Sequence, residues 1–243
     1  MLSTHVFLSE LIGTLVLILM GAGVCANVSL KGTLGSAAGW VAISFGWGLA
    51  VFCGVWVSAP SGGHLNPAVT FGTMINPEAT ELADGVAKTW GNASLYVLAQ
   101  LIGAFLGAVL AWLAYKKHFD QKENQGNVLG VFATGPVIRS YGWNLVSEII
   151  GTFILVFVIG GFGGTPNGLG PLAVGFLVVA IGLSLGGSTG YAINPARDLM
   201  PRLAHAILPI PGKGSSDWSY AWVPVVGPLL GGALGGLGVA FLL

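Results

Sequence analysis

The chain has 243 residues, of which 54% are hydrophobic and only 7% are charged, and its formal net charge is zero. Soluble domains carry roughly 25% charged residues, so this composition excludes an ordinary soluble domain and predicts an integral protein of the lipid bilayer. The balanced charge gives no reason to expect nucleic acid or an acidic substrate as a partner.

Six apolar stretches are long enough, at about 20 residues each, to cross the ~30 Å hydrocarbon core of a bilayer. We place these spans at residues 5–27, 36–59, 90–114, 143–163, 168–188 and 220–243. The first stretch has no basic segment before it, so we expect it to remain as a span and not to be a cleavable signal peptide. Polar connections rich in Gly or Pro separate the spans at 28–35, 115–142 and 206–219.

Two further apolar segments, 66–76 and 194–205, are too short to cross the membrane, and each begins with Asn-Pro-Ala. Asn is a favoured N-cap, and Pro at the first helical position gives up only a donor that would have no partner anyway. Both segments therefore predict half-helices that begin inside the protein. The two boxes consist of Asn66, Pro67 and Ala68, and of Asn194, Pro195 and Ala196.

The two halves of the chain also resemble each other. SELIGT at 9–14 returns as SEIIGT at 147–152, and each half contains three spans and one Asn-Pro-Ala box. Because each half has three spans, the second half lies upside down in the membrane relative to the first. Irregular backbone inside a membrane is tolerated only where it lines a cavity. The sequence thus predicts an all-α transport protein with a single transmembrane domain at 1–243, built from repeats at about 5–114 and 143–243.

The segments SGGHLNPAVT (61–70) and GYAINPARD (190–198), with a Glu early in the first and fourth spans, resemble the major intrinsic protein family of aquaporins and glycerol facilitators. The pair formed by Arg197 and the acidic Asp198 directly after it is similar to the pattern of the glycerol-facilitator, or aquaglyceroporin, branch. The resemblance implies six transmembrane helices plus two re-entrant half-helices in a right-handed bundle, with one pore per subunit of a homotetramer. It implies no catalytic residue, no cofactor and no metal.

If the two half-helices meet at their N-termini, Asn66 and Asn194 lie at the centre of the membrane. Each side-chain amide can then donate hydrogen bonds to a passing water or hydroxyl, and both helix N-termini add positive partial charge there. A cation or a hopping proton meets this barrier, whereas a neutral polyol does not. The simpler alternative is that both residues are only helix caps.

By resemblance, the narrow outer filter of the pore consists of Trp47, Gly182, Tyr191 and Arg197. Arginine inside a membrane is costly and marks a pathway, and its planar fork of donors suits the hydroxyls of a polyol. Gly182 stands where water-selective relatives usually have His, which implies a wider opening between aromatic walls. The chain departs from the family pattern in two places. The stretch from Trp47 to the first Asn-Pro-Ala box is one residue shorter, so Gly46 is the alternative to Trp47 at this filter position. Glycerol facilitators often have Phe in place of Tyr191.

The loops that precede the half-helices are rich in Gly, which lets their backbone approach a narrow pore. We expect their carbonyls to line it, at Gly62, Gly63, His64, Gly190, Tyr191 and Ala192. Glu10, Glu148 and Asp198 are expected to support these loops, the two glutamates by accepting hydrogen bonds from backbone N–H groups. A proton relay is the alternative for the glutamates.

The predicted function is a passive channel for glycerol and other small uncharged solutes, in a bacterial plasma membrane, that excludes ions and protons. Water, urea, dihydroxyacetone and undissociated lactic acid also fit such a filter. A coupled secondary transporter is the first alternative, because it shares inverted repeats and broken helices. The second is an intramembrane serine hydrolase, because GGSTG at 186–190 matches the G-x-S-x-G pattern, although outside a strand-turn-helix context.

Two arguments disagree on the orientation of the protein in the membrane. The family resemblance places both termini in the cytoplasm, whereas the positive-inside rule favours the opposite orientation. With the termini inside, Lys88 is the basic loop residue on the inner side, and the outer side holds Lys31, Lys116, Lys117, Lys122, Arg139 and Lys213. We follow the resemblance.

Overall fold

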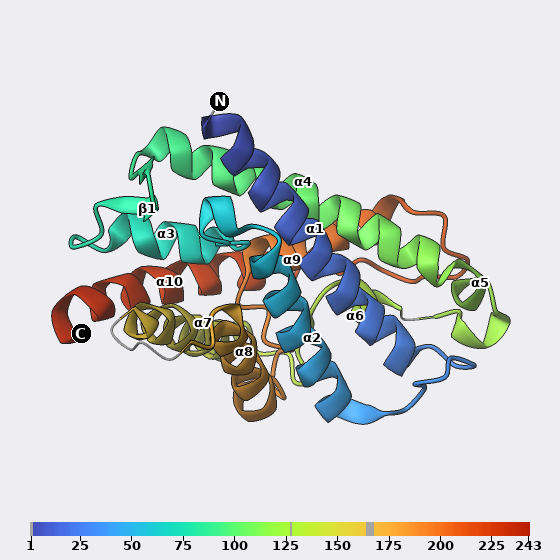
Figure 1. The fold of residues 1–243 in the computed structure, drawn as a ribbon. Helices are drawn as coiled ribbons and strands as arrows, with labels where there is room; N and C mark the ends of the chain where they lie inside the picture. The colour runs from blue at the N-terminus through green and yellow to red at the C-terminus, as the bar shows by residue number, and fades with distance from the viewer. Residues whose placement is uncertain (1, 127, 164–167) are drawn as a thin grey trace.

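The computed structural model describes residues 2–126, 128–163 and 168–243 and shows a bundle of helices (Figure 1). Within these residues, five helices are long and apolar enough to cross a membrane, and each overlaps a predicted span. They are α1 (Leu2–Ser29), α2 (Gly39–Trp56), α4 (Trp90–Ala114), α7 (Tyr141–Phe162) and α10 (Val223–Leu242). Exposed tryptophans lie near the ends of α2, α4, α7 and α10, where aromatic side chains anchor proteins at membrane interfaces; these are Trp40, Trp56, Trp90, Trp143 and Trp222.

The fifth predicted span, 168–188, is shorter in the structure than the sequence suggested. Here α8 (Pro171–Leu185) has 15 residues, which corresponds to about 22 Å at 1.5 Å per residue. Pro171 stands at its first position, and the chain leaves the helix at Gly186. Predicted residues 168–170 precede this helix, and residues 186–188 belong to the turn and loop that lead to the second half-helix.

The two predicted half-helices are present as α3 (Pro67–Ile75) and α9 (Pro195–Ile207). Each begins directly after an extended asparagine, Asn66 at φ −155° and Asn194 at φ −157°. Each half-helix packs on the last spanning helix of the other repeat: α3 lies against α10, and α9 lies against α4 (Figure 1). The two repeats are therefore interlocked across the middle of the bundle.

Small residues bring the spanning helices of each repeat into close contact. A Cβ atom added at Gly103 of α4 would lie 2.3 Å from the Leu11 carbonyl oxygen of α1, and one at Gly231 of α10 would lie 2.4 Å from the Ile149 oxygen of α7. Backbones approach this closely only where side chains are absent, as in small-xxx-small packing. The α1–α4 and α7–α10 pairs, together with an α2–α8 contact, form the frame around the half-helices.

Short elements that the sequence did not predict complete the ends of the bundle. A hairpin of β1 (Glu81–Ala83) and β2 (Val86–Ala87) follows α3. Single turns occur at η1 (Ala59–Ser61), α5 (Lys116–Phe119), η2 (Lys122–Asn124) and α6 (Leu129–Phe132). In Figure 1 the hairpin lies at the same end of the bundle as both chain termini, and α5 lies at the opposite end.

Candidate solute pathway

A cavity of about 330 Å³ lies inside the bundle, where the half-helices meet. The loops before α3 and α9 supply one part of its lining, namely Gly62, Gly63, His64, Leu65, Tyr191, Ala192 and Ile193. Apolar side chains of α1, α2, α7 and α8 supply another part, namely Leu17, Val51, Val55, Leu155, Ile159, Val174 and Val178. The lining thus combines backbone polar groups with an extended apolar wall.

Both asparagines of the Asn-Pro-Ala boxes line this cavity and also cap their own half-helices. The Asn66 Oδ1 atom accepts a hydrogen bond from the Ala68 N–H at 2.8 Å. The Asn194 Oδ1 atom accepts from the Ala196 N–H at 3.0 Å and from the Arg197 N–H at 3.2 Å. These contacts satisfy N–H groups that a helix start otherwise leaves without partners.

The same asparagines also bind the opposite repeat. The Asn66 Nδ2 group donates to the Ile193 carbonyl at 2.7 Å, and the Asn194 Nδ2 group donates to the Leu65 carbonyl at 2.8 Å. Leu65 and Ile193 adopt positive φ angles of 52° and 43°, which are uncommon for side chains of this type. Each amide nitrogen carries two N–H groups, so one on each asparagine remains for a solute.

Glu10 supports the first loop from α1. Its Oε1 atom accepts from the Ser61 hydroxyl at 2.7 Å and from the His64 N–H at 2.9 Å. Its Oε2 atom accepts from the Leu65 N–H at 2.8 Å and from the Gln100 side chain at 2.7 Å. The carboxylate is fully buried and is engaged on both oxygens, which fixes the turn that precedes Asn66.

Glu148 occupies the equivalent place on α7 in the second repeat. It accepts from the Thr189 hydroxyl at 2.7 Å, from the Ala192 N–H at 3.0 Å and from the Ile193 N–H at 2.9 Å. Neither Glu10 nor Glu148 is among the described residues that line the cavity. Their contacts are those of loop supports and do not form a continuous path for protons along the cavity.

Arg197 and Trp47 form the polar and aromatic sides of one cavity wall. The guanidinium carbon of Arg197 lies 3.9 Å from the centre of the Trp47 ring, a cation–π contact. Arg197 also donates to the Phe132 carbonyl at 3.0 Å, and the Trp47 ring nitrogen donates to Cys25 Sγ at 3.3 Å. A Cβ atom at Gly46 would lie 2.6 Å from Val24 of α1, so residue 46 faces α1 and the geometry favours Trp47 beside Arg197.

Gly182 lies behind Tyr191 and does not reach the lining of the cavity. A Cβ atom added at Gly182 would lie 2.8 Å from Tyr191 Cζ and 3.0 Å from Ser44 Oγ. The phenol ring therefore occupies the space that the missing side chain leaves. Gly190 is also absent from the lining and approaches Thr134 instead.

This arrangement predicts the effect of Gly182→Ala. The added methyl group pushes the Tyr191 ring toward the cavity, so glycerol flux should fall more than about tenfold while water flux falls less. Stopped-flow light scattering of proteoliposomes measures both fluxes. Tyr191→Phe is the matched control, because it keeps the ring and removes only the hydroxyl next to Gly182. Equal losses of the two fluxes would show that residue 182 does not set the width of the pathway.

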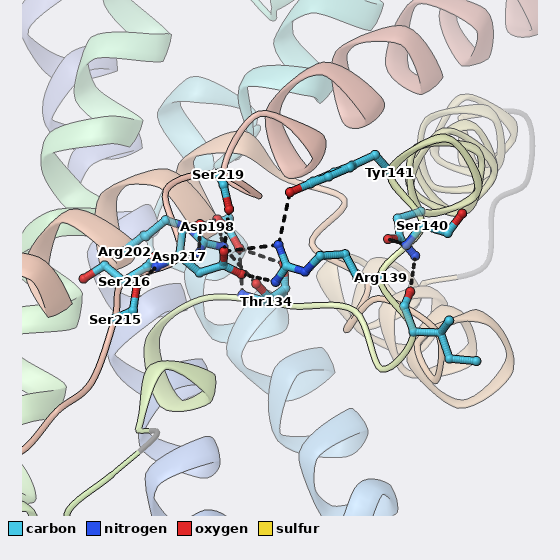
Figure 2. A network of polar contacts seen from close by, with 12 residues as sticks. Thr134, Arg139, Ser140, Tyr141, Asp198, Arg202, Ser215, Ser216, Asp217 and Ser219 are labelled. Carbon is cyan, nitrogen blue, oxygen red and sulfur yellow. Dashed lines mark hydrogen bonds and ion pairs between the residues drawn. The ribbon is translucent and has the colours of Figure 1, made fainter.

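A buried ion pair joins Asp198 and Arg202 within α9 (Figure 2). Asp198 accepts from the Thr134 N–H and hydroxyl, both at 2.7 Å, and from Arg202 Nε at 2.8 Å. Arg202 donates onward to the carbonyls of Ser216 at 2.9 Å and Thr134 at 2.8 Å. Asp198 and Arg202 are completely buried, and they join the loops 115–142 and 206–219 to α9.

The sequence analysis assigned no role to three residues that hold Arg197 and Asp198 in place, namely Phe132, Thr134 and Arg202. Arg202 carried a usable signal, because an Asp and an Arg four residues apart share one face of a helix. Phe132 carried none, since it acts through its backbone carbonyl. The Asp198–Arg202 pair is buried, and buried ion pairs contribute little to net stability. Its function here is therefore to join α9 to the two loops.

A second ion pair, Arg139 with Asp217, lies at the exposed edge of the same region (Figure 2). Arg139 Nη2 lies 2.5 Å from Asp217 Oδ2, and the Ser219 hydroxyl donates to the same carboxylate at 2.9 Å. Partial burial opposes ionisation of Asp217, but the bonds from Arg139 and Ser219 outweigh it and hold the pKa of this carboxyl below its ordinary value.

A lowered pKa predicts a specific pH dependence for Asp217→Asn. The ionised carboxylate stabilises the folded state above its unfolded pKa, and this contribution is lost as pH falls through the folded pKa. Wild type should therefore unfold at a higher temperature than the variant at neutral pH, and the difference should shrink below about pH 4 and in high salt. Asn tolerates the left-handed backbone at this position (φ 48°). A difference in unfolding temperature that grows on acidification would contradict the assignment.

Comparison with known proteins places these features in one family. The sequence profile described as "Major intrinsic protein" matches residues 2–238. The chain belongs to the major intrinsic protein family. It is 52% identical over 233 residues to the "Probable glycerol uptake facilitator protein" of Thermotoga maritima, covering 95% of this chain and 96% of that one. It is 53% identical to the "Glycerol uptake facilitator protein" of Bacillus subtilis, covering 95% of this chain and 82% of that one.

The fold agrees with this membership. The X-ray structure of the aquaglyceroporin from Plasmodium falciparum superposes with a TM-score of 0.81 at 30% identity, over 99% of this chain and 96% of that one. The major intrinsic protein described here is thus a multi-pass membrane channel and not an enzyme. The predicted fold class and family are confirmed, and the serine hydrolase alternative is set aside.

Proposed function

We propose that this protein is a passive channel for glycerol and related uncharged solutes in a bacterial plasma membrane. The observation that carries the proposal is the two-sided cavity. Arg197 and the free amide N–H groups of Asn66 and Asn194 present donors, while leucines, valines and an isoleucine present an apolar wall. A polyol has hydroxyls along one edge and carbon along the other, so it matches both sides. The names of the bacterial relatives support glycerol as the solute.

Within this proposal, Trp47, Tyr191 and Arg197 form the outer filter, and Gly182 sets the place of the Tyr191 ring. Asn66 and Asn194 form the central barrier at the positive ends of α3 and α9. Cations are excluded because they lose hydration, meet the Arg197 guanidinium at the filter and meet two helix N-termini at the central barrier. Water, urea, dihydroxyacetone and undissociated lactic acid are further candidates, since each is small and neutral.

The test is flux through the purified wild-type protein in liposomes. Glycerol equilibration should be much faster than in empty vesicles and should be unchanged when sodium and proton gradients are abolished. A requirement for either gradient would instead support the coupled transporter. Within the described residues, the ionisable groups next to the cavity are held in fixed hydrogen bonds, such as those of Glu10 and Glu148, which favours the uncoupled channel.

Assembly as a homotetramer and cytoplasmic termini are part of the same proposal. Chemical cross-linking in native membranes should give species up to four subunits and no larger closed assembly. For orientation, a cysteine introduced at the exposed Gln121 should react with an impermeant thiol reagent in intact cells. Reaction only after the cells are opened would place this loop inside and reverse the orientation.

A further inference from the structure

Two lysines occupy equivalent places at the outer ends of the two half-helices. The Lys88 ammonium donates to the carbonyls of Asn76 at 2.5 Å and Ala79 at 3.0 Å, where α3 ends. The Lys213 ammonium donates to the carbonyls of Ala206 at 2.6 Å and Leu208 at 2.8 Å, where α9 ends. Asn76 and Leu208 are the C-caps of the two helices.

Neither lysine pairs with a carboxylate in the part of the chain that the structure describes. Both are partly buried, so water screens their charge less than that of a free surface lysine. Each ammonium therefore acts on the end of a half-helix, where the last carbonyls concentrate negative partial charge. Each repeat has one such contact although the chain holds only 9 Lys and Arg residues in total.

The helix ends are close enough to affect the central barrier. The two helices have 9 and 13 residues, which places their C-terminal ends about 14 and 20 Å from the asparagines. At this separation the negative end of a helix partly cancels the positive field of its own N-terminus. An ammonium on the negative end removes that cancellation and leaves the positive N-terminus to act on an ion in the cavity.

We propose that Lys88 and Lys213 are positioning residues of the channel that raise its barrier to cations by neutralising the C-terminal ends of α3 and α9. The inference rests on the proposed function, since it assumes that neutral solutes cross the cavity where the half-helices meet. It assigns an electrostatic role in ion exclusion to residues that do not contact the solute. Glycerol, which carries no charge, is unaffected by the change in field.

The experiment separates charge from hydrogen bonding at each lysine. Three variants are compared: Met removes both the charge and the donor, Gln keeps a donor without charge, and Arg keeps both. Lys117→Met is the matched control, because Lys117 is exposed and its ammonium contacts neither half-helix. Potassium and proton leak under a membrane potential, and glycerol flux, are measured in the same proteoliposomes.

We expect the cation leak to rise about 3- to 10-fold in each Met and Gln variant and further in the double variant Lys88→Gln/Lys213→Gln. The Arg variants and Lys117→Met should keep the wild-type leak, and glycerol flux should stay within about twofold throughout. A Gln variant with wild-type leak, or a leak that rises equally in Lys117→Met, overturns the proposal. If the Met variants do not fold, the Gln and Arg variants still decide. Failure of wild type to conduct glycerol would instead contradict the proposed function.

Discussion

Glu148→Ala is expected to abolish glycerol flux and to leave little folded protein after extraction from the membrane. The substitution removes the acceptor of three buried donors: the Thr189 hydroxyl and the N–H groups of Ala192 and Ile193. Each unsatisfied buried donor costs about 1–3 kcal/mol, so the loss approaches the whole stability of many domains. Thermal unfolding in detergent and glycerol flux per folded protein measure the two effects.

Two comparisons make this prediction specific. Glu123→Ala removes a carboxylate from an exposed position and should leave both stability and flux close to wild type. Glu148→Gln keeps one acceptor oxygen but directs an NH₂ group at a donor, so its effect should be smaller than that of Ala and still large. Full glycerol flux in Glu148→Ala would show that the second loop holds its shape without this carboxylate.

Lactic acid should cross the protein only in its protonated form, so its flux should fall about tenfold for each pH unit above the pKa of the acid. The lactate anion is attracted by Arg197, but it must then pass the apolar wall. Desolvating an ion costs several kcal/mol even after relaxation, and each 1.36 kcal/mol slows passage tenfold. The neutral acid avoids that cost and dominates the flux as a minority species.

Liposome acidification and isotope uptake at a fixed total concentration measure this dependence. Glycerol flux in the same vesicles is the internal control and should stay constant across the pH range, since glycerol does not ionise there. Lactate uptake that remained steady from mildly acidic to neutral pH would mean that the anion passes. The exclusion of ions at Arg197 and at the asparagines would then be wrong.

Much of the fold was predictable because its main signals are local. The lengths of the apolar runs determined the spans, and Asn-Pro in two places determined where α3 and α9 begin. The length of the fifth span was wrong because its predicted bounds took in three residues on either side of the helix, whereas Pro171 begins α8 and two glycines follow its last residue, Leu185.

Other features depend on contacts that no local pattern encodes. The β1–β2 hairpin has too few residues to show alternation, yet Leu82 of β1 lines the cavity and accepts from the His64 ring at 2.9 Å. The Phe132 carbonyl that holds Arg197 is chemically the same as every other carbonyl in the chain. The place of Gly182 behind Tyr191 follows from how the loop after α8 folds back against that helix, and a sequence motif records only that both residues are present.

The reciprocal bonds of Asn66 and Asn194 have a consequence for biogenesis. A ribosome delivers the first repeat to the membrane well before residues 193 and 194 exist, so α3 is inserted without its partner carbonyl and without α10 beside it. The inner wall of the pathway cannot take its final form until translation is nearly complete. A nascent chain arrested before residue 193 should therefore have its first spans inserted while the contact between the two half-helices is still missing. Quality-control proteases should recognise such incomplete chains mainly during the last third of synthesis.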